Sequence, residues 1–69
     1  MITKEQFDNL KVGDVVLYAD KDDLENYGTP GTVTARLSDG HILISFPKYS
    51  QTVEFTGKTS FKWLDLPNK

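Results

Sequence analysis

Hydrophobic and polar residues alternate along much of this chain, and residues typical of turns separate the alternating runs. Alternation with a period of two is typical of strands that bury one face. Five such runs predict strands at residues 15–18, 31–37, 41–46, 52–56 and 60–66. Because these strands are short and only one helix is expected, we predict a mainly β fold. The simplest form is a small five-stranded barrel, closed or partly open, since closure protects the edges of a sheet.

The first residues of the chain carry the signals of a helix start. Thr3 and Gln6 have the spacing of a capping box, and Ile2 and Phe7 have that of a hydrophobic staple. A short helix that covers one end of the barrel is therefore predicted. The expected layout is a helix within residues 3–11 and a barrel over residues 12–66, in one domain of residues 1–69.

A hairpin is predicted around Asp39-Gly40, a pair that favours a two-residue turn because both positions must tolerate positive φ. A loop of that length places three apolar pairs on one face of the hairpin: Leu37–Ile42, Ala35–Ile44 and Val33–Phe46. The core is then expected to contain this face and its neighbours: Val16, Val33, Ala35, Leu37, Ile42, Ile44, Phe46, Val53, Phe55 and Leu64.

Charge is spread unevenly along the 69 residues, whose net charge is -2. Residues 1–40 contain four basic and eight acidic side chains, whereas residues 41–69 contain four basic and two acidic ones. This balance does not favour a general binder of polyanions, so any nucleic-acid site would have to be a local patch. The chain has no cysteine and no basic-then-apolar leader, and its apolar runs are too short to span a membrane. We therefore expect a cytoplasmic protein.

No catalytic, cofactor or metal site is expected. Gly57-Lys58-Thr59 matches the end of a P-loop, but position 52 is Thr where that motif needs glycine, so a turn is predicted instead. His41 is the single histidine, and a catalytic histidine needs an orienting partner and a nucleophile. The chain lacks the His or Cys pair typical of zinc sites. Its acidic segment also lacks the glycine and the glutamate spacing of an EF-hand. We expect a protein that is not an enzyme.

Three segments carry a resemblance to a known family: KVGDVVLY at residues 11–18, GTPGTV at residues 28–33 and ILISF at residues 42–46. Gly13-Asp14 and the later glycines resemble the positions that open the first two strands of SH3-like barrels of the KOW/Tudor type. The resemblance implies a five-stranded SH3-like barrel that binds macromolecules, with aromatic side chains of the loops lining a ligand groove. The acidic insertion at residues 20–27 departs from the KOW pattern.

Two candidate surfaces follow from the acidic and the basic side chains. The expected protein-binding surface combines acidic and aromatic residues: Asp20, Asp22, Asp23, Glu25, Tyr27, Tyr49 and Trp63. Aromatic rings can hold cations through cation–π attraction, although Trp63 could equally be part of the core. The alternative is a nucleic-acid surface with Tyr49 as a stacking ring and four basic residues: Arg36, Lys48, Lys58 and Lys62.

We expect a protein partner in preference to nucleic acid, and a small accessory or regulatory role. Origin from a phage or plasmid is a hypothesis that rests on size alone. A homodimer is a further alternative, because Val15, Leu17 and Leu43 have the parity of the outward face and could form an exposed apolar patch.

Overall fold

The computed structural model describes residues 1–57 and 60–67, and of residues 60 and 61 only the backbone. The elements in chain order are helix α1 (Lys4–Asp8), strands β1 (Val15–Tyr18), β2 (Pro30–Arg36) and β3 (Ile42–Phe46), the 3-10 helix η1 (Pro47–Tyr49), strand β4 (Gln51–Phe55), the 3-10 helix η2 (Ser60–Trp63) and strand β5 (Leu64–Asp65).

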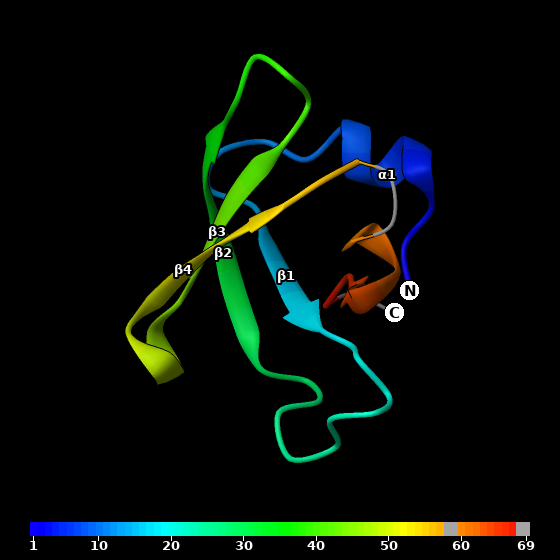
Figure 1. Ribbon diagram of the computed structural model, residues 1–69, viewed down its shortest axis with the longest axis vertical. Coiled ribbons are helices and arrows are strands. Elements are labelled where there is room, and N and C mark those ends of the chain that lie inside the picture. The colour runs from blue at the N-terminus through cyan, green and yellow to red at the C-terminus, as the bar shows by residue number, and fades with distance from the viewer. Residues whose placement is uncertain (58–59, 68–69) are drawn as a thin grey trace.

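Five antiparallel strands form one curled sheet in the order β4-β3-β2-β1-β5, which has the shape of a half-barrel (Figure 1). The predicted mainly β, five-stranded SH3-like architecture with a short N-terminal helix is therefore confirmed. Strands β4 and β5 are the two ends of this order, and no pairing between them occurs among the described residues. The barrel is consequently open along one side.

Helix α1 begins as the sequence predicts and is shorter than expected. The Thr3 hydroxyl accepts a hydrogen bond from the Gln6 backbone N–H at 3.0 Å, and the Thr3 N–H donates to the Gln6 side chain at 2.9 Å. The helix ends at Asp8 instead of extending toward residue 11. Three apolar side chains of this region are buried in the core: Ile2 before the helix, Phe7 within it and Leu10 just beyond it. The helix therefore closes one end of the half-barrel.

Arg36 at the end of β2 also belongs to this closed end. Its guanidinium donates to the carbonyl oxygens of Leu10 at 2.8 Å and Phe7 at 3.4 Å. Carbonyl groups at the end of a helix have no partner within the helix. A cationic side chain of the sheet thus satisfies backbone acceptors of the segment that covers it.

The predicted hairpin between β2 and β3 is present, but the predicted register is wrong. The Leu37 N–H donates to the His41 carbonyl at 2.9 Å across a loop of three residues, in which only Gly40 has a positive φ, 87°. A two-residue turn would need positive φ at two positions, which an Asp tolerates less well than a Gly. Arg36 therefore pairs with Ile42, and an irregularity between Val33 and Ala35 shifts the register again.

This irregularity decides which residues of β2 reach the core. Beyond the bulge, Val33 pairs with Ile44, and both side chains are buried. A bulge of one extra residue restores the inward parity of Val33 after the longer loop has shifted it. Two predicted core residues on the loop side of the bulge are wrong, since Ala35 is only half-buried and Leu37 is 37 % exposed. A third, Val53 on β4, is also wrong and is 38 % exposed. The other members of the predicted core are buried: Val16, Val33, Ile42, Ile44, Phe46, Phe55 and Leu64.

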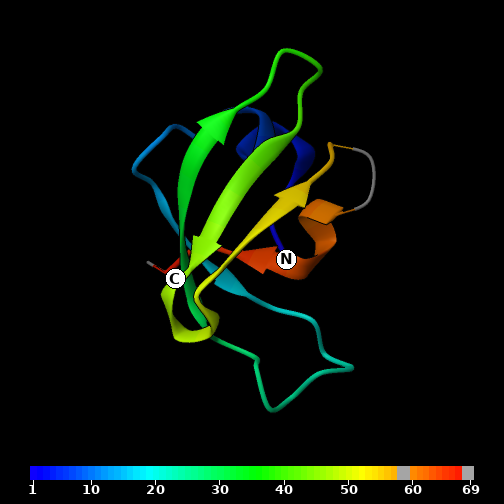
Figure 2. The ribbon, with the colours of Figure 1, turned by 60° about the vertical axis from the view of Figure 1, so that its left-hand side comes forward.

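The last predicted strand is mostly wrong, because residues 60–63 form the 3-10 helix η2 and only Leu64–Asp65 pair with β1. Leu64 is nonetheless fully buried. A short 3-10 turn reverses the chain so that β5 reaches the free edge of β1 (Figure 2). No helix in the described part of the chain has the length and apolar character that crossing a membrane requires.

Candidate functional site

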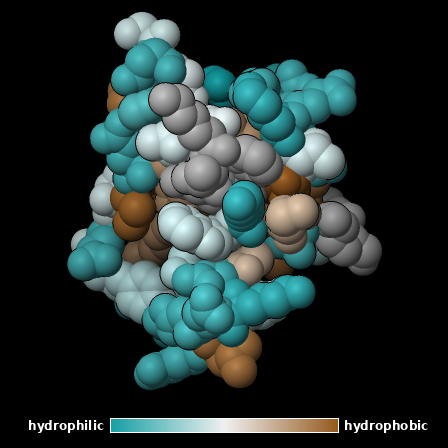
Figure 3. Space-filling view, turned by 45° about the vertical axis from the view of Figure 1, so that its right-hand side comes forward, coloured by the Kyte–Doolittle hydropathy of each residue, from teal (hydrophilic) through white to brown (hydrophobic). Residues whose placement is uncertain are grey.

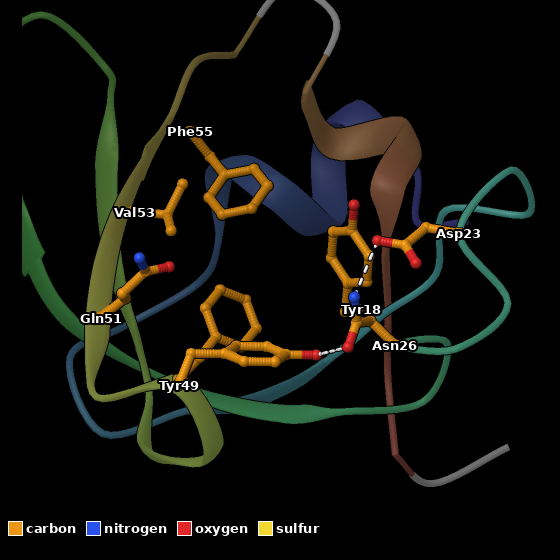
Figure 4. A pocket seen from close by; sticks show the side chains of 8 residues that line it. Tyr18, Asp23, Asn26, Tyr49, Gln51, Val53 and Phe55 are labelled. Carbon is orange, nitrogen blue, oxygen red and sulfur yellow. Dashed lines mark hydrogen bonds between the residues drawn. The ribbon is translucent and has the colours of Figure 1, made fainter.

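A pocket of about 290 Å³ lies at the open side of the half-barrel. Strand β4 forms one wall with Gln51, Val53 and Phe55, which are alternate residues and therefore share one face. The opposite wall comes from Tyr18 at the end of β1 and from the segment between β1 and β2 (Figure 4). The inner face of β4 is partly uncovered here, because Val53 on that face is 38 % exposed.

Four aromatic rings make up the apolar part of this pocket. The Phe46 ring is central: its centroid lies 6.2 Å from that of Tyr18, 6.4 Å from that of Tyr49 and 6.3 Å from that of Phe55. The Tyr18 contact is edge-to-face, the geometry that aromatic quadrupoles favour. Phe46 is buried and Tyr49 half-buried, so the rings form a continuous surface from the core to solvent.

The absence of a side chain at Gly31 explains why the Phe46 ring can lie at the centre of the pocket. A Cβ atom at this position would come within 2.7 Å of the Phe46 ring and within 2.7 Å of the Ile44 side chain. Real Cβ atoms essentially never approach other atoms so closely. Glycine in the second strand is thus required by the packing of the ring that forms the floor of the pocket.

Hydrogen bonds tie the acidic segment to the aromatic wall. The Tyr49 hydroxyl donates to the Asn26 side-chain oxygen, and the Asn26 amide donates to an Asp23 carboxylate oxygen at 2.9 Å. The Tyr49 hydroxyl also lies 3.2 Å from the hydroxyl of Thr29, which is buried. Figure 4 shows the bonds from Tyr49 to Asn26 and from Asn26 to Asp23, which join η1 to the segment between β1 and β2. The segment is therefore held in place by side chains on both sides of the pocket.

Carboxylates dominate the electrostatics of this rim. The Tyr18 hydroxyl donates to Asp20 at 3.3 Å. Burial raises the pKa of Tyr18 above its usual 10.0, and the nearby charges of Asp20 and Asp23 raise the pKa further. A negative potential at the rim disfavours ionisation of the phenol and would favour a bound cation.

The structure brings together some of the predicted protein-binding residues and separates others. Asp23 and Tyr49 line the pocket, and Asp20 contacts Tyr18 beside it. The remaining predicted residues do not line it: Asp22 and Glu25 are exposed, Tyr27 is 47 % exposed, and Trp63 is 44 % exposed. From the sequence, Trp63 was expected to lie either in the core or in a ligand groove. The Trp63 side chain lies in neither. Its carbonyl accepts the Ala19 N–H at 2.7 Å.

The basic residues predicted for nucleic acid do not gather in one place in the described part of the chain. Arg36 binds the carbonyls near α1, whereas Lys48 lies in η1, 5.7 Å from the centroid of the Tyr49 ring. These two positions are near opposite ends of β3, a strand that spans roughly 17 Å at about 3.4 Å per residue. Lys62 is exposed in η2, and Lys58 lies outside the described residues.

The predicted site lacked six of the pocket residues: Tyr18, Asn26, Phe46, Gln51, Val53 and Phe55. Phe46, Val53 and Phe55 were assigned to a closed core by their parity, which correctly placed them on the inner face. No local signal showed that this face would be left open, because residues 60–66 were expected to form a full strand and only Leu64–Asp65 do. The apolar patch suggested for the outward face is small: Val15 is 44 % exposed, while Leu17 and Leu43 are half-buried.

The hydrophobic side chains on the face shown in Figure 3 appear in small separate groups between hydrophilic ones. Comparison with models of protein families, with curated proteins and with solved structures finds no match to this chain.

Proposed function

We propose that this protein is a non-enzymatic interaction module that binds a basic, extended segment of another protein at the pocket between β4 and the acidic segment. The observation that carries the proposal is the combination of four aromatic rings with carboxylates on one rim. A Lys or Arg side chain matches both parts, because its stem packs on rings and its charge is attracted to ring faces and carboxylates.

The neighbouring strand edge supports an extended ligand. Strand β4 pairs with β3, and its other edge has no strand partner in the described ranges 1–57 and 60–67. Such an edge offers backbone N–H and C=O groups to an added strand. An extended segment along β4 would place alternate side chains toward the pocket that Gln51, Val53 and Phe55 line.

The acidic segment would also speed the encounter with such a partner. Residues 20–25 contain four acidic side chains and one lysine. Opposite charge on two partners raises the association rate, and this effect weakens as salt is added. As part of this proposal the barrel is of the Tudor type, because Tudor-like barrels also bind their ligands through aromatic rings. An accessory or regulatory role in the cytoplasm belongs to it as well.

The test uses the isotope-labelled protein and short peptides of stated sequence type: one rich in Lys and Arg, and one of equal length rich in Asp and Glu. The basic peptide is expected to shift amide signals of the pocket residues Tyr18, Asn26, Tyr49 and Gln51, with saturation at one equivalent. The acidic peptide is expected to shift none of them. Signals that move instead around Arg36, Lys48 and Lys62 on addition of a single-stranded oligonucleotide would favour the nucleic-acid alternative.

A matched pair of charge variants sharpens this test. Asp23→Asn removes a carboxylate at the pocket and keeps an oxygen that can accept from Asn26, whereas Glu5→Gln removes one in the first turn of α1. Asp23→Asn is expected to weaken peptide binding about tenfold, equivalent to about 1.4 kcal/mol, and Glu5→Gln to leave it nearly unchanged. Equal effects of the two variants would contradict a specific site.

A further inference from the structure

A second cluster of polar side chains lies away from the pocket, at the end of the sheet where the β2–β3 loop meets β4. Asp39, His41 and Glu54 each direct one donor atom into it, and these atoms all lie within 4.8 Å of one another. The His41 Nδ1 atom contacts Glu54 Oε2 and lies 3.6 Å from Asp39 Oδ2. One imidazole nitrogen therefore faces two carboxylates.

The backbone places these three side chains by strand register and loop geometry. Leu43 pairs with Glu54, and His41 is two residues before Leu43, so His41 and Glu54 lie on the same face as diagonal neighbours. The Asp39 Oδ1 atom accepts the His41 backbone N–H at 3.1 Å, which leaves Oδ2 on the side of the imidazole ring. A tight loop and a paired strand thus hold the three donors close together.

We propose that Asp39, His41 and Glu54 form a binding site for a divalent first-row transition metal ion such as Zn²⁺. Metal bonds to imidazole nitrogen and carboxylate oxygen are about 2.0–2.2 Å long, so two ligand atoms on one ion are about 3.0–3.5 Å apart. The 3.6 Å between His41 Nδ1 and Asp39 Oδ2 is close to that spacing. The ion would bind Nδ1 of the neutral ring, whose proton would then lie on Nε2, and would take the place of the contact between the ring and the carboxylates.

The donor set also indicates which ions would bind. Imidazole suits zinc, copper, iron and nickel, whereas magnesium and calcium prefer oxygen ligands alone. Three protein ligands leave at least one position for water or for a group of a partner. Because His41 is 30 % exposed, Asp39 60 % and Glu54 49 %, the site is open to solvent and exchange of the ion is expected to be fast. The sequence expectation of no metal site rested on the absence of a His or Cys pair, and it did not pair His41 with Glu54, which is 13 residues away.

The experiment titrates the untagged chain with ZnCl₂ and, in parallel, with MgCl₂. His41 is the single imidazole of the chain, which has no cysteine, so competing strong ligands are few. Zn²⁺ is expected to bind at one equivalent, to shift the ring signals of His41 and to raise the temperature of unfolding. MgCl₂ at equal concentration is expected to do none of these.

Two variants and a control separate the site from non-specific binding. Glu54→Gln and His41→Gln each remove one ligand from the exposed surface and are each expected to weaken Zn²⁺ binding at least tenfold. Glu5→Gln, an acidic residue of α1, is expected to leave it unchanged. Zn²⁺ that binds all four proteins equally, or that leaves the His41 ring signals in place, would show that the cluster is an ion pair only and would overturn the proposal.

Discussion

The two ends of the half-barrel bury aromatic rings in opposite ways. At the closed end, Phe7 of α1 is fully buried and Arg36 binds the carbonyls of the segment around it. At the open side, the rings around Phe46 extend from the core to the surface, and carboxylates line the rim. The closed end uses the chain's own residues to satisfy its apolar and polar groups. The open side presents apolar and charged groups together, which is typical of a surface that binds a ligand.

The largest expected effect tests the closed end. Phe7→Ala removes a fully buried ring, which should cost about 3–5 kcal/mol of unfolding free energy. Domains of this size have a stability of roughly 3–10 kcal/mol, so much of the variant should be unfolded. Urea denaturation followed by circular dichroism measures this.

The milder variant Phe7→Leu should stay folded, so its peptide binding can be compared with that of the wild type. It should cost about 1 kcal/mol and leave peptide binding by the folded protein unchanged. Loss of peptide affinity in folded Phe7→Leu would mean that the two ends of the half-barrel are coupled.

A middle-sized effect tests the floor of the open side. Gly31→Ala forces a methyl group to within 2.7 Å of both Phe46 and Ile44, so it should cost about 1–3 kcal/mol and displace the Phe46 ring. Gly57→Ala is the matched control, because its nearest contact would be an ordinary 3.5 Å to the Phe7 ring. Thermal unfolding and the near-ultraviolet circular dichroism of the aromatic rings measure both variants. Equal destabilisation by the two substitutions would contradict the packing described at Gly31.

The smallest effect concerns the acidic rim. Burial and the carboxylates of Asp20 and Asp23 raise the pKa of Tyr18 above 10.0, so the folded protein holds the phenol proton to higher pH than the unfolded chain does. This contribution to stability is complete below pH 10 and is lost as the pH rises above 10 through the raised pKa. Urea denaturation on both sides of pH 10 should show a steeper loss for the wild type than for Tyr18→Phe. The exposed Tyr27 provides the control, since Tyr27→Phe should lose unfolding free energy above pH 10 as steeply as the wild type does.

Local signals in the sequence were sufficient for much of the fold. The capping box at Thr3 and Gln6 is a contact between neighbours, and it forms as predicted. The alternation of apolar residues correctly located all of the first four strands and most of the core, because burial of one face depends mainly on the period of the pattern. The register of the β2–β3 hairpin was wrong, since the backbone conformation of Asp39 and the compensating bulge are settled by the fit of the whole sheet.

The candidate site was only partly predictable for the same reason. The acidic segment and Tyr49 stood out by composition, and Asp23 and Tyr49 do meet at the pocket. Nothing local indicated that β5 would be two residues long and leave the inner face of β4 uncovered.

By itself, the sequence determined the helix start, the identity of most strands and the inward face of each, because these depend on residues close together along the chain. Tertiary structure alone decided the bulge in β2, the opening beside β4 and the contact of His41 with Glu54. These features depend on which strands pair and in which register. Pairing joins residues far apart in the sequence, and its energy is shared over the whole sheet.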